Sequence, residues 1–246
     1  MLANTFNAPS IIDAWRKAAV CISSPGETPY VVVVTAGSAW VGTVAEQRGL
    51  DEAANASGAE RPTAVAEMLL PRVVHLSTEN PDAAIEAGLK LLGRGRKQGL
   101  RYSTWTHTYF ERMVGLWEDR FGVRKEIKIN RLLGTIRKIN EWDKNAEAAF
   151  YIHTDLSTDN FRPRGSPCLQ YVQFRVYGDY KLSIIGLYRS HDYTNKFLGN
   201  AVGLQRLGQF VAQHTGRQYE GLAIISLNPF CGNKQQLKSF MTNVGS

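Results

Sequence analysis

The 246-residue sequence lacks the long apolar runs and paired cysteines that define several classes of protein. No stretch approaches the roughly 20 apolar residues of a membrane-spanning helix, and the first residues lack the basic and apolar segments of a signal peptide. Three widely spaced cysteines without a Cys-x-x-Cys pair indicate neither a disulfide framework nor a zinc ribbon. Five histidines without His-x-x-x-His spacing indicate no metal site. These absences predict a soluble, cytoplasmic protein without a membrane partner or a metal.

Acidic residues are fewer than basic ones, with 22 Asp and Glu against 29 Lys and Arg and a net charge of +7. This balance favours anionic partners, which include phosphorylated small molecules as well as nucleic acid. The densest basic cluster, at 94–97, is short and has no interleaved aromatic residues, so we do not expect nucleic acid as the partner. A solvated basic surface explains the charge equally well.

Apolar residues recur with helical spacing in some segments and with strand spacing in others, which predicts a mixed chain around one core. The helical segments are 11–22, 83–92, 129–139 and 201–214, and the strand-like segments are 30–35, 148–152, 169–176, 181–188 and 222–227. Asn80-Pro81 would begin the second helix and Gly93 would end it. Residues 36–62 have weak periodicity and predict an irregular connection, and the last residues are expected to be frayed.

Two of the strand-like segments flank Gly178-Asp179, a pair typical of a hairpin turn. Cys168 directly precedes the first of these strands, and Arg189 directly follows the second. Because antiparallel partners begin and end at the same edge of a sheet, we expect Cys168 and Arg189 to be neighbours.

A thiol beside a guanidinium has several possible meanings. Cysteine reacts as the thiolate, and a nearby cation such as Arg189 lowers the thiol pKa. The structural alternative is strong, because cysteine is among the most often buried residue types. A cysteine hydrolase would also need a general-base histidine held by a third group, and no local signature marks His153 or His191 for that role.

The joint spacing of polar residues narrows these alternatives. The relevant motifs are Pro167-Cys168 with Gln173-Phe174, then Arg189-Ser190-x-Asp192, then Leu198-Gly199-Asn200 and finally Gln213-x-Thr-Gly216. Residues 129–216 thereby resemble the thymidylate synthases and the related pyrimidine-nucleotide hydroxymethylases. The resemblance implies an α+β fold with a large mixed β-sheet flanked by helices, and a homodimer through sheet packing. The chain would be one domain over 1–246, with a divergent part at 1–75 and a core at 76–246 that carries the site.

The same resemblance implies an enzyme that transfers a one-carbon unit, as methyl or hydroxymethyl, from 5,10-methylenetetrahydrofolate to C5 of a pyrimidine nucleotide or nucleoside. Cys168 would add to C6 and make C5 nucleophilic. The implied catalytic residues are Cys168, Arg189 and Glu86; the implied substrate-binding residues are Arg189, Ser190, Asn200, Gln170 and Asn228; and the implied folate-binding residues are Asp192 and Trp105. In this family an amide at the position of Asn200 goes with uracil and a carboxylate with cytosine.

The chain departs from the family where the phosphate and sugar would bind. The family's paired arginines fall on Ala146 and Glu147, and its His-x-Tyr falls on Asn228 and Phe230. Leu169 stands where many synthases have histidine. These differences leave open a non-catalytic nucleotide-binding or scaffold protein on the same fold and, with less support, a nucleic-acid-binding module.

Overall fold

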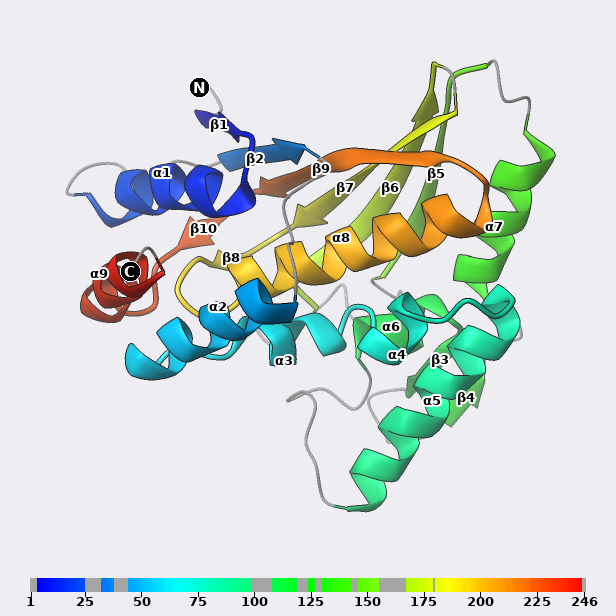
Figure 1. Cartoon of the computed structure of the whole chain (residues 1–246), viewed down its shortest axis with the longest axis horizontal. Helices are drawn as coiled ribbons and strands as arrows, with labels where there is room; N and C mark the ends of the chain where they lie inside the picture. Colours follow the sequence, from blue (N-terminus) through cyan, green and yellow to red (C-terminus); the bar gives the residue numbers. More distant parts are fainter. Residues whose placement is uncertain are drawn as a thin grey trace.

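The computed structural model shows a mixed α+β chain whose helices flank a large mixed sheet (Figure 1). It describes residues 4–24, 32–37, 44–98, 108–118, 124–126, 130–142, 146–154, 167–178 and 180–244. The sheet has the order β1-β2-β9-β7-β6-β5. Its strands are β1 (Asn4–Ala8), β2 (Val32–Gly37), β5 (Ala148–His153), β6 (Leu169–Tyr177), β7 (Lys181–Tyr188) and β9 (Gln218–Ser226).

The remaining elements are two short strand pairs and the helices. The strand pairs are β3 (Leu116–Glu118) with β4 (Arg124–Glu126), and β8 (His191–Asp192) with β10 (Pro229–Phe230). The helices are α1 (Ile11–Ser23), α2 (Val44–Ala56), α3 (Pro62–Glu67), α4 (Arg72–His75), α5 (Pro81–Lys97), α6 (Tyr109–Met113), α7 (Arg131–Glu141), α8 (Phe197–His214) and α9 (Lys234–Asn243). None of the helices in the described ranges is long and apolar enough to cross a membrane.

The predicted hairpin is present at the middle of the sheet. Strands β6 and β7 pair antiparallel, and β7 also pairs with β9 in parallel. Gly178 and Tyr180 have φ of 50° and 64°, which produces the tight reversal between β6 and β7. The start of β6 and the end of β7 therefore lie side by side, at the end of the hairpin opposite its turn.

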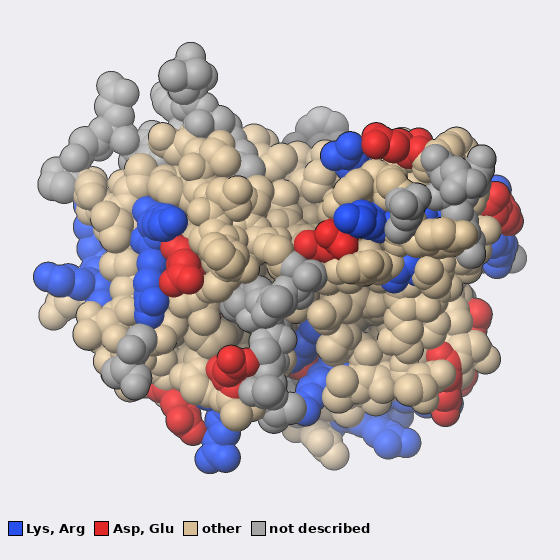
Figure 2. All heavy atoms as spheres, turned by 45° about the horizontal axis from the view of Figure 1, so that its top comes forward, with Lys and Arg blue, Asp and Glu red and all other residues tan. Residues whose placement is uncertain are grey.

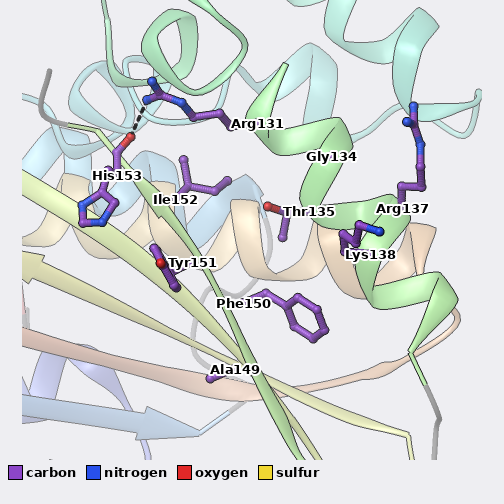
Figure 3. A pocket seen from close by; sticks show the side chains of 10 residues that line it. All are labelled: Arg131, Gly134, Thr135, Arg137, Lys138, Ala149, Phe150, Tyr151, Ile152 and His153. Carbon is purple, nitrogen blue, oxygen red and sulfur yellow. Dashed lines mark hydrogen bonds between the residues drawn. The ribbon is translucent and has the colours of Figure 1, made fainter. Parts of the chain in front are cut away.

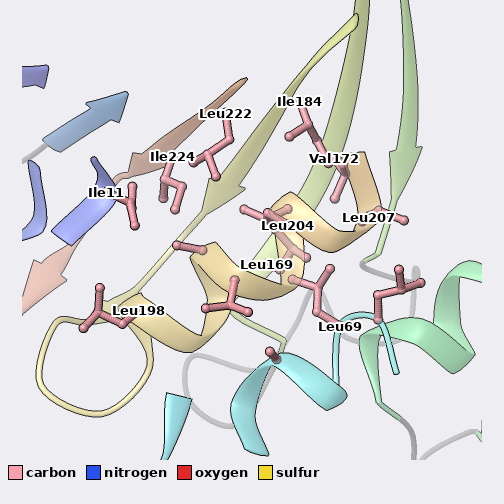
Figure 4. Close-up of a cluster of buried hydrophobic side chains, with 14 of the residues drawn as sticks. Ile11, Leu69, Leu169, Val172, Ile184, Leu198, Leu204, Leu207, Leu222 and Ile224 are labelled. Carbon is pink, nitrogen blue, oxygen red and sulfur yellow. The ribbon is translucent and has the colours of Figure 1, made fainter. Parts of the chain in front are cut away.

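Helix α8 is the centre of the core. Its 18 residues lie between strands β7 and β9 on one side and α3 on the other, and most of its side chains are buried (Figure 4). Gly186 of β7 permits this close approach, because a Cβ there would lie 2.5 Å from Leu204 Cδ1. Helix α8 is consequently fixed from both sides, and it carries Asn200 in its first turn.

The first and last elements belong to the same body as the hairpin. Strands β1 and β2 extend the main sheet beyond β9. Trp15 of α1 is fully buried, donates from Nε1 to the Tyr193 carbonyl at 2.9 Å and packs edge-on against Phe240 of α9, with ring centroids 5.2 Å apart. The segment that follows β7 is thus held by both ends of the described chain.

Three local predictions were wrong. Within the segment 36–62, expected to be irregular, α2 forms a helix of 13 residues. Helix α5 begins at Asn80 as predicted, with its side chain accepting from Ala83 N at 2.9 Å, but continues past Gly93 to Lys97. The expected frayed end contains α9, whose Leu237 and Phe240 are buried. In each case tertiary packing outweighs weak local propensity.

Basic and acidic side chains are interspersed on the molecular face seen in Figure 2, around a broad area without charged residues. The net charge of +7 is therefore not gathered into one basic patch on that face.

Candidate active site

Cys168 and Arg189 are neighbours at the open end of the hairpin, opposite its turn. The Arg189 backbone N donates to the Cys168 carbonyl at 2.8 Å. The Arg189 side chain turns back along the same residues, with Nε donating to the Pro167 carbonyl at 3.3 Å. A half-buried thiol and a guanidinium thus share one corner of the sheet.

Burial raises the pKa of the Cys168 thiol above its ordinary value, because a thiolate loses hydration there. The positive charge of Arg189 and, to a smaller extent, that of Lys196 act in the opposite direction. Lys196 is the residue that precedes α8, so the turn after β7 also contributes to the field at the thiol. Activation of the thiol therefore depends on these two cations.

Arg189→Gln is expected to raise the pKa of Cys168 further, because it removes the stronger of the two favourable charges. The alkylation rate of Cys168 by iodoacetamide, followed by peptide mass spectrometry from pH 6 to 10, should rise at higher pH in the variant than in the wild type. Lys196→Gln is the matched control and should give a smaller shift in the same direction. An unchanged or lowered midpoint in Arg189→Gln would contradict this electrostatic account.

Tyr109 is a site residue that was not among those implied by the resemblance. It begins α6, where Thr108 and Glu111 form a capping box and Glu111 pairs with Arg96. The Tyr109 hydroxyl accepts hydrogen bonds from the backbone N of Cys168 at 3.1 Å and of Leu169 at 3.2 Å. Burial, followed by the proximity of the Cys168 thiol, raises the pKa of Tyr109 to about 12. Tyr109 is therefore a neutral phenol that holds the backbone of the thiol-bearing residue.

Tyr109→Phe should destabilise the fold by about 1–3 kcal/mol, because two backbone N–H groups lose their acceptor. Urea unfolding measures the change. Tyr151→Phe, at a side chain that is 63% exposed, is the control and should fall within about 0.5 kcal/mol of the wild type. Equal stability of the two variants would show that the Tyr109 hydroxyl does not hold this turn.

The turn after β7 presents a fixed carboxylate. Asp192 Oδ1 accepts from Thr194 N at 2.8 Å, and its Oδ2 accepts from Asn195 Nδ2 at 3.0 Å. The carboxylate of Asp192 is half-buried and lies beside Gly232, where a Cβ would lie 3.4 Å from Oδ2. Asp192 is thus held in place by its own turn and keeps further lone pairs for a ligand.

A buried polar network connects this turn with α8. His191 is 1% exposed, and its Nδ1 lies 2.9 Å from Ser226 Oγ while its Nε2 lies 3.0 Å from Asn200 Nδ2. Tyr193 Oη lies 3.1 Å from the same Ser226 Oγ. The imidazole is stacked on Tyr188, with ring centroids 4.0 Å apart and planes 12° apart. Burial lowers the pKa of His191 to about 3, so the ring is neutral.

Tyr188 brings a further hydroxyl toward the thiol. Its side chain is fully buried, and its Oη has no hydrogen-bond partner among the described residues. Burial and the proximity of Tyr109 and Cys168 raise the pKa of Tyr188 well above the ordinary value. The thiol is therefore bordered by a guanidinium and two neutral phenols.

The structure does not bring Glu86 to this site. The buried face of α5 is formed by other residues, namely Ala84, Ile85, Gly88, Leu92 and Gly95. Glu86 lies on the opposite face, where its side chain is 65% exposed and pairs with Lys90 at 2.7 Å. Glu86 was implied because the family's catalytic glutamate lies in a helix that ends near a glycine, and Glu86 comes seven residues before Gly93. This distance does not determine the direction of a helical side chain. We do not retain a catalytic role for Glu86.

The other predicted residues differ in how they are placed relative to the Cys168 thiol. Ser190 and Gln170 are half-buried near the thiol, and Gln170 Nε2 donates to the Pro167 carbonyl at 2.8 Å. Asn228 has an exposed side chain, and its carbonyl accepts from His191 N at 3.0 Å. Trp105 lies outside the described residues.

The region of the expected arginine pair has a different arrangement. Glu147 at the start of the β5 segment pairs with Arg175 of β6 at 3.2 Å, and both side chains are largely exposed. An open pocket of about 590 Å³ lies further along, between α7 and β5 (Figure 3). It is lined by Arg131, Gly134, Thr135, Arg137, Lys138 and 149–153. This pocket contains none of the residues predicted for catalysis or binding.

The described chain is thus an α+β protein with a half-buried thiol beside a guanidinium at one edge of a mixed sheet. No family model matches it. It is similar to a protein of Methanocaldococcus jannaschii named "Putative thymidylate synthase", with 38% identity over 96 residues. The alignment covers 37% of this chain and 42% of the relative. The aligned part is thus less than half the length of this relative.

Proposed function

We propose that this protein is a thymidylate-synthase-like enzyme that transfers a methyl or hydroxymethyl group to C5 of a pyrimidine nucleotide or nucleoside. The observation that carries the proposal is the corner at which Arg189 N bonds the Cys168 carbonyl, with Asp192 and Asn200 on the segment that follows. The similarity to the M. jannaschii protein supports the same chemistry. A structural cysteine needs none of these neighbours.

In the proposed reaction the Cys168 thiolate attacks C6 of the pyrimidine. The S–C6 bond forms while the C5–C6 π electrons move onto C5 and O4, which gives an enolate. C5 is then nucleophilic and would bond to the one-carbon unit, and loss of the C5 proton would accompany the breaking of the bond between that unit and the donor nitrogen. The exocyclic methylene left on C5 would take a hydride from the reduced folate to become methyl, or water to become hydroxymethyl, and release of the thiolate restores the ring. Arg189 lowers the free energy of the thiolate before the attack, and Tyr109 fixes the backbone of the nucleophile.

The one-carbon donor proposed for this reaction is 5,10-methylenetetrahydrofolate, which would supply the group that becomes attached to C5. The donor set fits a ring with several N–H groups, because the Asp192 carboxylate is fixed by Thr194 and Asn195 and still has free lone pairs. Asp192 would hold the donor, and Trp105 is kept as a proposed contact.

Arg189 and Ser190 would bind an anionic group of the substrate, since a guanidinium presents a planar fork of N–H donors. Asn200 would bind the edge of the base. Glu147 brings a negative charge where the family has arginine, so we propose that a 5′-phosphate is bound less tightly than in that family or by other cations.

We further propose that residues 1–246 form a single domain and that two copies form a homodimer through the main sheet. Side chains of β7 alternate between buried and half-buried, and the half-buried set includes Ile185 and Leu187. Tyr151 on β5 is 63% exposed. A second copy would cover this apolar face. Sedimentation velocity distinguishes the dimer from a monomer of 27.4 kDa.

A second candidate is a nucleotide-binding or scaffold protein that uses the same fold without catalysis. Two observations favour it: the pKa of the Cys168 thiol is raised, and Glu147 pairs with Arg175 where a phosphate-binding arginine is expected. Binding alone would not require a nucleophile.

Release of tritium to water from pyrimidines labelled at C5 tests the proposal. UMP, dUMP, CMP, dCMP and their nucleosides are each incubated with the protein, with and without 5,10-methylenetetrahydrofolate. Covalent addition alone exchanges the C5 hydrogen with water, and group transfer releases it irreversibly. We expect folate-stimulated release from at least one substrate. Binding without exchange or release would favour the second candidate. The absence of both binding and release would exclude these substrates.

A further inference from the structure

The buried network around His191 has two self-consistent arrangements of protons. In the first, Nδ1–H donates to Ser226 Oγ and Nε2 accepts from Asn200 Nδ2. In the second, Ser226 donates to Nδ1 and Nε2–H donates to Asn200 Oδ1, which requires the amide to turn by half a rotation about χ2. A neutral imidazole has one donor and one acceptor, so a mixed arrangement leaves a buried clash or an unpaired group.

Asn200 Nδ2 lies 3.0 Å from His191 Nε2. This geometry matches the first arrangement, because an amide NH₂ group only donates. Asn200 is 6% exposed, and turning its amide would place Oδ1 against the lone pair of Nε2. Ser226 and the stacked Tyr188 ring in turn hold the imidazole. The orientation of the amide and the tautomer of the neighbouring ring are therefore coupled.

We propose that His191 is a positioning residue that fixes the Asn200 amide with Nδ2 toward the imidazole, and so determines which pyrimidine edge the site accepts. This inference rests on the proposed function, in which Asn200 binds the base. The second N–H of Nδ2 and the Oδ1 acceptor remain for the ligand. Their order across the amide can reverse only if the ring changes to the second tautomer at the same time.

A fixed order of donor and acceptor selects between bases. Uracil presents the O4 acceptor and the N3–H donor, whereas cytosine presents the N4–H donor and the N3 acceptor in the same two places. An amide that turns freely would satisfy both edges. A locked amide pairs with one edge and opposes the other, because mismatched donors and acceptors remain unpaired in a buried site.

The first test needs no ligand. Two-bond ¹H–¹⁵N spectra of the full chain, with His191 assigned through a His191→Asn sample, report which ring nitrogen carries the proton. We expect protonated Nδ1 and non-protonated Nε2 in a neutral ring from pH 5 to 8. Protonated Nε2 would overturn the inference even if the enzyme is active.

The second test compares two variants that each preserve one half of the network. The terminal amide of glutamine reaches about as far as Nε2 and can accept from Asn200, whereas that of asparagine reaches only to the position of Nδ1 and can bond Ser226. Calorimetry with UMP and CMP gives the ratio of the two Kd values. We expect His191→Asn to reduce this ratio by about tenfold or more, equivalent to about 1.4 kcal/mol, and His191→Gln to retain most of it.

Thermal unfolding of both variants separates misfolding from loss of discrimination. An equal ratio in the wild type and His191→Asn, or an equal loss in both folded variants, would overturn the positioning role. If neither UMP nor CMP binds the wild type, the proposed function fails for these substrates, and the tautomer alone then decides whether His191 fixes the amide. The failures of the two proposals are thus distinguishable.

Discussion

Cys168→Ala is expected to abolish tritium release from the substrate labelled at C5, by about 10⁴-fold or more, because no other group can form the bond to C6. The structure makes this a local change. The thiol is half-buried, and the turn that carries it is held by the backbone bonds to Tyr109 and Arg189. The variant should therefore fold and still bind the pyrimidine.

Cys21→Ala is the matched control, since Cys21 is also free and half-buried but lies on α1. Its release rate should be that of the wild type. If Cys168→Ala retained folate-stimulated release, covalent addition by Cys168 would be disproved. If the wild type bound pyrimidines and released no tritium, the binding-protein alternative would gain support.

Gly199→Ala is expected to destabilise the protein by about 1–3 kcal/mol and to weaken pyrimidine binding, because α8 has no room for a side chain there. A Cβ at Gly199 would lie 2.4 Å from Val65 Cβ and 2.7 Å from the Pro62 carbonyl oxygen, so α8 would have to move away from α3. Asn200 is the next residue and would move with it. Urea unfolding and calorimetry measure the two effects.

Gly93→Ala gives the opposite control on another helix. Apart from the backbone of α5 itself and the two chain neighbours, no atom of the described residues lies within 4 Å of a Cβ at Gly93. Alanine should therefore stabilise the fold by about 0.5–1 kcal/mol through its higher helix propensity. A Gly199→Ala protein as stable as Gly93→Ala would show that α3 and α8 are not in close contact.

The elements with strong local signals could be predicted from the sequence. The hairpin of β6 and β7 combines alternating apolar residues with a turn at Gly178, and both features act over a few residues. Its geometry alone placed Cys168 beside Arg189. The N-cap of α5 at Asn80 is similarly local.

Elements whose stability comes from distant partners could not be predicted. Helix α9 has few apolar residues, and Phe240 becomes structural only by packing against Trp15 of α1. Glycine is a common end signal, but helix α5 passes Gly93 because the next turn is held by the fold: Gly95 is buried and Arg96 pairs with Glu111 of α6.

The site shows the same division. Tyr109 is 59 residues away from Cys168 in the sequence, so only the fold brings its hydroxyl to the Cys168 backbone N. His191 lies within a motif, but its bonds to Ser226 and Asn200 depend on β9 and α8. Glu86 was predicted from its distance to Gly93 along the chain, but on α5 its side chain points to solvent.

The most direct test of the central claim is whether Cys168 becomes covalently attached to a pyrimidine. A hydrogen at C5 is removed as a proton, but a fluorine at C5 cannot be removed as a cation. A 5-fluoropyrimidine nucleotide should therefore remain covalently attached to the protein in the presence of 5,10-methylenetetrahydrofolate. We predict that mass spectrometry finds the added mass on the peptide that contains Cys168, and that Cys168→Ala shows none. The absence of an adduct with a 5-fluoro analogue of a pyrimidine that binds, or an adduct on Cys21 or Cys231 instead, would contradict the claim.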